Sequence, residues 1–434
     1  MNNKSLPFLC SLLLTQTILS ASEPLSLSHA YELALKNEPK LQSYNYKVLA
    51  NAQSVDQIKA RYYPQVQGTL SWGRYEYNAE YLAKGAVKEN YTDYSLSASQ
   101  AIYHPEVWRG IDQAKTRQKS MEQQYNAEAQ KLGLDLTKAY FLLLRENKTV
   151  ELTLSQKEYY EQKYKQQVEM LNFGLTNRID LLDTKIEKDK STSAWLIEQK
   201  RAHVAKLRLE NLIGEKVEEL KPFDFAKINT AKLELDRTGW ELKIQHSPSL
   251  QAAHYNVQVA EDEVAIREYD HYPKVDFSLT RKETNTNDTI AHTYDNQAVL
   301  RLNLPIYTGG YTQSKVKEGM LQLDSAKKER DYYLKDTQAR FEETWEERQY
   351  TLENFKTIKE SEISAALFLE SNEKAYSAGL KSIVDVLEAR AKLYTIKRDL
   401  IDAGYELINN HLTLLDITGE LNVETIGEYE NLIN

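Results

Sequence analysis

The 434-residue chain contains little proline and little glycine. It has 9 prolines and 15 glycines, well below the roughly 5% and 7% that are typical of soluble proteins. Residues 106–221 and 306–434 contain no proline at all. Because an interior proline costs a helix about 3 kcal/mol, these long tracts, rich in Glu, Lys, Leu and Ala, predict long helices.

The only cysteine, Cys10, lies in a segment with the features of a secretory signal peptide. Residues 1–22 contain Lys4, an apolar run over 6–19, and small residues at positions 20 and 22, so cleavage is expected before Glu23. The mature chain would then have no cysteine, which excludes disulfides, thiolate metal sites and cysteine nucleophiles.

Hydropathy and charge exclude two further classes of protein. The chain is 41% hydrophobic with a mean hydropathy of −0.61, which excludes a polytopic helical membrane protein. Its formal net charge of −9 argues against non-specific binding of nucleic acid, so we expect no nucleic-acid partner.

What the chain does contain is a long internal repeat. Residues 31–41 align with 240–250, 63–66 with 272–275, 174–183 with 379–388, and 214–215 with 419–420. Landmarks that recur in one order predict a tandem duplication. The predicted organisation is a signal peptide (1–22), a first repeat (23–220), a linker (221–238), a second repeat (239–423) and a C-terminal tail (424–434).

Each half is predicted to begin with a helix and two strands. In the first half the helix covers 28–61, is capped at Ser26 or Ser28, and is bent at Pro39. The strands alternate between apolar and polar residues, as in Val66, Leu70 and Trp72 against Gln67, Thr69 and Ser71, or Leu300, Leu302, Leu304 and Ile306 against Arg301 and Asn303. Polar loops are predicted between the strands, at Tyr75, Tyr77, Tyr81 and Tyr91 and at Asn285, Asn287 and Asp288.

A long helix and a shorter returning helix complete each half. The long helices are predicted over 106–173 and 312–378, and the returning helices over 179–213 and 383–417. Apolar residues spaced mostly three and four apart along 111–143 indicate a coiled-coil seam.

Four strands cannot close a barrel by themselves, so their edges would be left unpaired. Their alternation and aromatic flanks fit a membrane β-barrel that is apolar outside and polar inside. Closure then requires several chains, and twelve or sixteen strands would leave a pore. The alternative is a small soluble β-sandwich that carries coiled coils.

These repeats resemble the TolC-like outer-membrane factors, also called outer membrane efflux proteins. The resemblance covers residues 23–423 and is most specific at the paired prolines, at 305–310 and at the turn 379–388. It implies a mostly α fold with a small β part: tandem-repeat coiled-coil helices and four membrane strands per chain, forming a homotrimer with a twelve-stranded β-barrel continued by a twelve-helix α-barrel. The implied function is a passive exit duct in the outer membrane, gated at its periplasmic end, for a tripartite efflux pump or a type I secretion system. The implied partners are a periplasmic adaptor protein, an inner-membrane transporter and outer-membrane lipid.

The same resemblance assigns residues at the periplasmic mouth. Asp385 and Glu388 fall on the positions of the acidic rings at the pore constriction, and their i, i+3 spacing places them on one helix face. Such rings would favour cations and raise the pKa of their own carboxyls. Asp180, Tyr376 and Lys381 fall on positions of a gate latch between hairpins, and Gly174 and Gly379 on the hairpin turns. Lys381 stands where the family often has Arg, and because Lys cannot form a bidentate pair we expect a weaker latch.

Nothing in the sequence indicates an enzyme, a metal site or a cofactor. Di-iron bundles need two Glu-x-x-His pairs, and only residues 268–271 supply one. There is also no phosphate-binding loop and no nucleophile elbow. The alternative function left open is a periplasmic coiled-coil scaffold or adaptor without a channel. The exported cargo and the specific partners cannot be read from the sequence.

Overall fold

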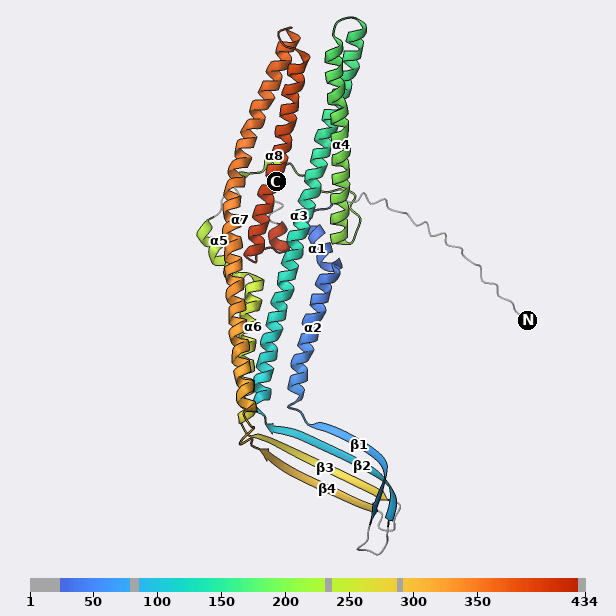
Figure 1. Ribbon diagram of the computed structural model, residues 1–434, viewed down its shortest axis with the longest axis vertical. Coiled ribbons are helices and arrows are strands. Elements are labelled where there is room, and N and C mark those ends of the chain that lie inside the picture. The colour runs from blue at the N-terminus through green and yellow to red at the C-terminus, as the bar shows by residue number, and fades with distance from the viewer. Residues whose placement is uncertain (1–23, 79–85, 231–235, 287–291, 428–434) are drawn as a thin grey trace, which may run out of the picture.

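The computed structural model describes residues 24–78, 86–230, 236–286 and 292–427. The predicted signal peptide, Tyr81, Asn287 and Asp288 lie outside these residues, as do parts of the predicted linker and tail. The described chain is a long rod of helices with a four-stranded sheet at one end and two helical hairpins at the other (Figure 1). No described helix combines the length and the apolar character that crossing a membrane requires.

The described part of the first half contains four α-helices and two strands. They are α1 (Leu27–Asn37), α2 (Pro39–Ala60), β1 (Gln65–Asn78), β2 (Ala86–Tyr103), α3 (Pro105–Asn172) and α4 (Arg178–Ile213). The prediction of one bent helix over 28–61 is wrong, because the chain breaks into α1 and α2 at Glu38. Pro39 forces Glu38 into extended geometry (ψ 113°), and the Glu38 carboxylate then caps α2 by accepting from the Lys40 N–H.

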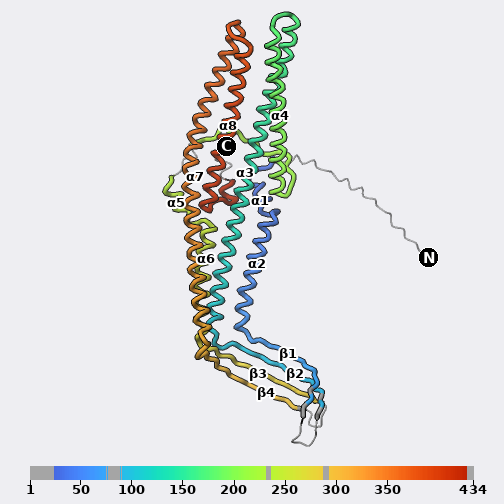
Figure 2. The backbone as a smooth tube through the Cα atoms, viewed as in Figure 1, coloured from blue at the N-terminus to red at the C-terminus, as the bar shows by residue number. Residues whose placement is uncertain are grey.

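The second half follows the same order, as the path of the chain shows (Figure 2). Its elements are η2 (Phe225–Lys227), α5 (Arg237–Lys243), η4 (Ile244–His246), α6 (Pro248–Glu268), η5 (Tyr269–His271), β3 (Lys274–Thr286), β4 (His292–Asn303), α7 (Tyr311–Ser377) and α8 (Ile383–Ile417). Helices α3 and α7 contain 68 and 67 residues, which at 1.5 Å per residue gives each a length of about 100 Å. The predicted long helices are thus confirmed to within a residue or two at each end.

The four strands form one antiparallel sheet in the order β1-β2-β3-β4. In its register Gln67 faces Ser97, Ser97 faces Thr280, and Thr280 faces Gln297, so one face of the sheet is polar. The opposite face is apolar and open: Val66, Trp72 and Leu300 are 69%, 79% and 69% exposed. The predicted alternation is therefore confirmed.

The strands differ from the prediction at their ends. Tyr75 and Tyr77 lie inside β1, Tyr91 inside β2 and Asn285 inside β3, so the predicted loops are shorter than expected. The prediction took these residues as loop residues, but tyrosine is enriched in strands and favours continued pairing. Leu304 and Ile306 follow the end of β4 and are not strand residues, since Pro305 removes a backbone donor between them.

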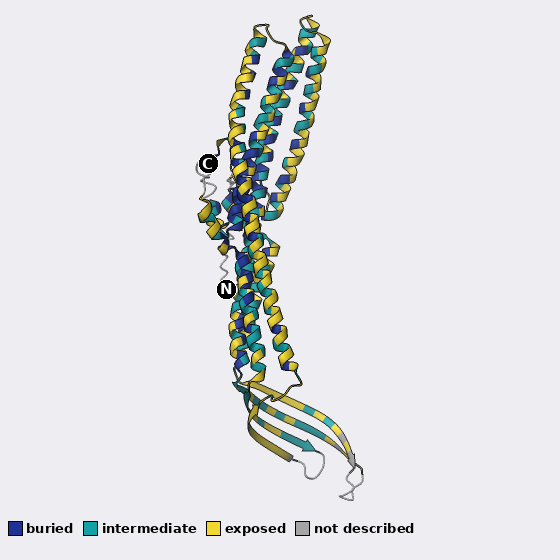
Figure 3. Cartoon of the chain, turned by 60° about the vertical axis from the view of Figure 1, so that its left-hand side comes forward, coloured by how far each residue is buried: buried dark blue, intermediate teal, exposed yellow. Residues whose placement is uncertain are grey.

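The core is concentrated in the middle of the rod, where buried residues gather (Figure 3). There α1, α3, α4 and α8 pack together with the segment that joins the two halves. The Tyr140 hydroxyl donates to the Leu25 carbonyl (2.8 Å), and Phe141, Phe223 and Phe225 meet edge to face. This core packs around the bases of the two hairpins, and their tips extend beyond it.

Candidate functional site

The tips of the two helical hairpins are built from one repeated local sequence. Each long helix ends at a glycine in the left-handed region, Gly174 (φ 69°) after α3 and Gly379 (φ 73°) after α7. In both turns the backbone N–H of the residue after the glycine donates to a carbonyl of the last helical turn. Leu175 donates to the Met170 carbonyl and Leu380 to the Ala375 carbonyl. Both turns need glycine at these positions, because residues with side chains rarely adopt this conformation.

The returning helices also begin alike. Asn177 caps α4 by accepting from the backbone N–H groups of Ile179 and Asp180 at 2.8 and 2.9 Å. Ser382 caps α8 in a full capping box with Asp385. Asp180 and Asp385 therefore hold the same place, the third residue of the returning helix, and each carboxylate helps to fix its own turn.

Asp385 is held by three donors of its own hairpin. Its carboxylate accepts from the Ser382 hydroxyl (2.6 Å), the Ser382 backbone N–H (2.9 Å) and the Lys381 ammonium (2.9 Å). These hydrogen bonds, from Ser382 first and Lys381 next, hold the pKa of Asp385 well below its ordinary value. The expected raising of pKa by neighbouring acidic rings is thus opposed by contacts within each chain.

The other predicted residues are placed as follows. Glu388 is exposed, one turn further along α8 than Asp385. The Asp180 carboxylate accepts from Thr176 and Asn177, both at 3.2 Å. Tyr376 packs on the apolar cluster formed by Tyr160, Leu369, Ile383, Val386, Leu387 and Ala389. Within the described chain, no hydrogen bond or ion pair joins Asp180 to Tyr376 or Lys381, so their latch role stays a prediction.

A different set of residues links the two hairpins. Tyr160 of α3 is fully buried against α8, and its hydroxyl donates to the Leu387 carbonyl at 3.4 Å. Its burial raises the pKa of Tyr160 to about 12. Next to it, the Arg390 guanidinium of α8 lies 3.8 Å from the centre of the Tyr159 ring and pairs with Glu373 of α7. No local sequence pattern indicates this link, because Tyr160 and Leu387 are 227 residues apart.

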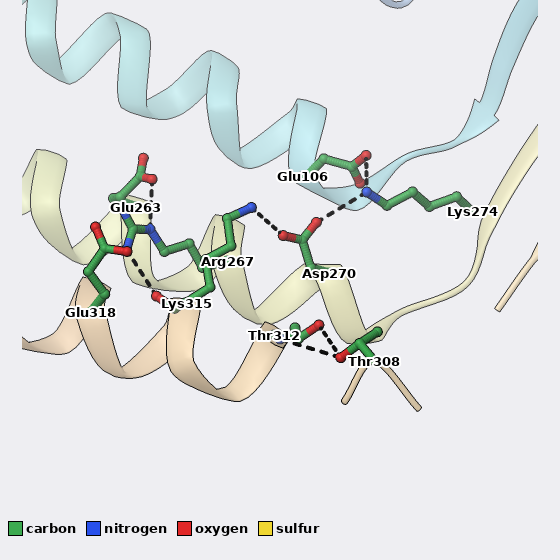
Figure 4. Close-up of polar contacts among 9 residues, drawn as sticks. All are labelled: Glu106, Glu263, Arg267, Asp270, Lys274, Thr308, Thr312, Lys315 and Glu318. Carbon is green, nitrogen blue, oxygen red and sulfur yellow. Dashed lines mark hydrogen bonds and ion pairs between the residues drawn. The ribbon is translucent and has the colours of Figure 1, made fainter. Parts of the chain in front are cut away.

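A second polar cluster lies where the strands meet the helices (Figure 4). Lys274 at the start of β3 pairs with Glu106 of α3 (3.0 Å) and with Asp270 (3.3 Å), and Asp270 also pairs with Lys315 of α7 (2.6 Å). Burial acts to raise the pKa of Asp270, but hydrogen bonds from Lys315 and Lys274 outweigh it and leave that pKa below its ordinary value. His104 extends the cluster, with its two ring nitrogens 3.1 Å from Glu106 and 2.9 Å from Asp276.

This junction cluster joins the consecutive elements η5 and β3 to α3 and α7, which are distant from them in the sequence. One turn away, Arg267 of α6 pairs with Glu263 (3.0 Å) and Glu318 (3.4 Å) and donates to the Lys315 carbonyl. The cluster therefore connects the start of β3 to the ends of α3, α6 and α7 that lie next to the sheet. Its acidic groups are all close to basic ones, and in the part of the chain that the structure describes no three His, Cys, Asp or Glu side chains are grouped as a metal ion would need.

The chain is similar to known proteins in both sequence and structure. The sequence profile of the outer membrane efflux protein family matches residues 30–215 and 241–420. The chain is 23% identical to the outer membrane protein TolC of Escherichia coli K12, over 99% of this chain and 89% of that protein. It is 22% identical to the proteases secretion protein PrtF of Dickeya chrysanthemi, over 93% and 90% of the two chains. Among solved structures, the outer membrane protein VceC of Vibrio cholerae matches with a TM-score of 0.77 and 17% identity, covering 91% of this chain and 96% of that one.

Proposed function

This chain belongs to the outer membrane efflux protein family, and we propose that three copies of it form a passive exit duct in the outer membrane. The duct serves a tripartite efflux pump or a type I secretion system. The observation that carries this proposal is the sheet. It has four strands with one open apolar face and one polar face, and in the described residues no strand pairs with the outer edges of β1 and β4. Three such sheets joined edge to edge would give a twelve-stranded barrel with a water-filled lumen.

The two ends of the chain then have different surroundings. The apolar face of the sheet, including Leu70, Trp72 and Leu300, contacts outer-membrane lipid. The helical rod extends into the periplasm, where its hairpin tips point toward a periplasmic adaptor protein and an inner-membrane transporter. Energy comes from that transporter, and the duct itself performs no chemistry. The name of the family, outer membrane efflux protein, and that of a relative, proteases secretion protein, support the two kinds of export.

The gate of the duct is assigned to the hairpin tips. Asp385 and Glu388 of each chain line the constriction, where three copies of each make two acidic rings that prefer cations. The contacts of Asp385 with Ser382 and Lys381 support a defined position for its carboxylate at the start of α8. Asp180, Tyr376 and Lys381 contribute to the latch between hairpins when the chains assemble.

Two measurements test this function. Membrane fractionation distinguishes the duct from a periplasmic scaffold or adaptor, because the duct must be found in the outer membrane as a heat-modifiable oligomer. Recording in planar bilayers should show a small, cation-preferring conductance that multivalent cations block. The double substitution of Asp385→Ala and Glu388→Ala should remove the block.

The matched control for the acidic rings is Glu370→Ala. Glu370 is an exposed carboxylate of α7 that pairs with Lys374 one turn away on the same helix, so its loss should leave the block intact. A block that survives the double substitution refutes the assignment of Asp385 and Glu388. A chain found only in the soluble periplasmic fraction refutes the duct itself.

A further inference from the structure

Gly73 and Tyr91 are directly opposite each other in the ladder between β1 and β2. A β-carbon built on Gly73 would lie 2.5 Å from the Tyr91 hydroxyl oxygen and 2.6 Å from two ring carbons. These distances are shorter than any real contact of a β-carbon, so the ring lies across the space that a side chain at position 73 would occupy. A glycine inside a strand is typical of such a close approach.

Gly68 shows that this arrangement is specific to position 73. It lies in the same strand, and a β-carbon built there meets no atom within 4 Å. Gly68 also points to the other face of the sheet, because the two positions differ by an odd number of residues. The strand thus has one glycine over which an aromatic ring lies and one that faces open space.

Tyr91 and Gly73 belong to the polar face of the sheet. Tyr91 is two residues before Asp93, whose carboxylate accepts from the Thr284 hydroxyl (2.6 Å) and pairs with Lys282 (3.1 Å). Gly73 is two residues after Ser71 and next to Trp72, which is 79% exposed on the apolar face. Gly73 is in the second half of β1 and Tyr91 in the first half of β2, so both lie in the half of the sheet that is remote from α2 and α3.

We propose that Gly73 keeps the Tyr91 ring flat against the wall of the barrel, and that this pair sets the clear width of the outer exit. The inference rests on the proposed duct, in which the polar face lines the lumen and three copies of the pair lie at one level. Because the ring lies flat across a glycine, it occupies little of the radius of the lumen. Any side chain at position 73 would displace the ring, and the free direction for it is toward the axis of the lumen. The pair would therefore decide how bulky an exported molecule can be when it leaves.

Labelling of a cysteine below the pair measures this width independently of the periplasmic gate. Ser99 is exposed on the same face of β2 and lies closer to the helices than Tyr91. The only natural cysteine is Cys10, in the predicted signal peptide, so Ser99→Cys gives a single reporter. Maleimides linked to polyethylene glycol of graded size are added to whole cells, and the largest reagent that reacts reports the width of the exit.

The Ser99→Cys reporter is combined with four further sets of substitutions, and each has an expected result. Gly73→Val should stop labelling by the larger reagents and leave the smallest one reactive, while Gly68→Val should label like the natural sequence. Adding Tyr91→Ala to Gly73→Val should restore the larger reagents. Tyr91→Ala alone should change the size limit little, because the ring already lies against the wall.

The outcomes separate this inference from the proposed function. An unchanged size limit in Gly73→Val, or no restoration by Tyr91→Ala, overturns the role of the pair. A marked widening by Tyr91→Ala alone also overturns it, since the ring would then project into the lumen already. If Gly73→Val does not reach the membrane, Gly73→Ala brings a single β-carbon against the same ring and is judged by the same criteria. If even the smallest reagent fails to reach Ser99→Cys in the natural background, the barrel duct itself is refuted.

Discussion

The contact of Arg390 with Tyr159 should contribute measurably to keeping the hairpins together. The guanidinium lies 3.8 Å from the ring centre, and the arginine side chain is 22% exposed, so the contact is largely shielded from water. A cation–π contact of this kind is worth about 1 kcal/mol. With three copies in the proposed duct the total is about 3 kcal/mol, which would shift a balance between open and closed tips about a hundredfold.

Arg390→Ala tests this estimate. The substitution should raise the open probability in planar bilayers by about two orders of magnitude, and it should make cells permeable to large antibiotics. Arg390→Lys should have an intermediate effect, because an ammonium keeps the charge and loses the planar stacking. Lys397→Ala is the control: Lys397 is also a basic residue of α8, but its partner Glu362 belongs to the same hairpin (3.9 Å).

This role of Arg390 is refuted if Arg390→Ala assembles normally and opens no more often than the natural sequence. It is also refuted if Lys397→Ala opens the duct equally, since general loss of positive charge would then explain both results. Tyr160→Phe provides a second probe of the same interface, because it removes only the hydroxyl that donates to the Leu387 carbonyl. Its expected effect is smaller, about 0.5–1.5 kcal/mol per chain.

Three further predictions concern the stability of the chain. Gly379→Ala should destabilise the α7–α8 turn by about 1–2 kcal/mol, because a side chain disfavours its φ of 73°, and limited proteolysis of the tip should become faster; unchanged proteolysis would contradict this role of the turn. Asp385 has a lowered pKa, so its stabilising contacts are present above the ordinary aspartate pKa and are lost as the pH falls below it; hydrogen exchange at the tip should accelerate in acid, and Asp385→Asn should weaken that dependence. His411 is buried, and desolvation, followed by the charge of Arg348, lowers its pKa to about 3. The unfolded chain therefore binds an extra proton between about pH 6.5 and 3, so this residue should cost about 2 kcal/mol of stability at pH 5 relative to neutral pH. Thermal unfolding of His411→Gln at both pH values should show a correspondingly smaller loss, and an equal loss in both proteins would refute the assignment.

The helices and turns could be predicted because their signals are local. The absence of proline permits the long helices α3 and α7. Gly174 and Gly379 end these helices because glycine readily adopts the left-handed backbone conformation of the turn. The same local chemistry explains the main errors. A proline at 39 was expected to bend a helix, and instead the extended geometry of Glu38 divided it in two. Polar residues at the strand ends suggested loops, although the backbone remained paired.

The candidate gate was predicted only in outline. The repeat placed Asp180 and Asp385 at equivalent positions, and the structure explains this equivalence by their common place in the first turn of a helix. The sequence could not tell that Lys381 and Ser382 hold the Asp385 carboxylate, because this depends on side-chain rotamers at the turn. It also could not give the role of Tyr159, Tyr160 and Arg390, since the long-range contacts of these residues join α3 to α8.

By itself, then, the sequence determined the repeat, the lengths of the long helices and the two faces of the sheet, because each follows from the spacing of residues along the chain. Only the tertiary structure decided which side chains meet across elements. It brought Glu106, Asp270, Lys274 and Lys315 together at the junction, Arg390 onto the Tyr159 ring, and Tyr91 across Gly73. Most of these contacts join residues that are far apart in the chain, and packing of the helices and register of the strands fix them all.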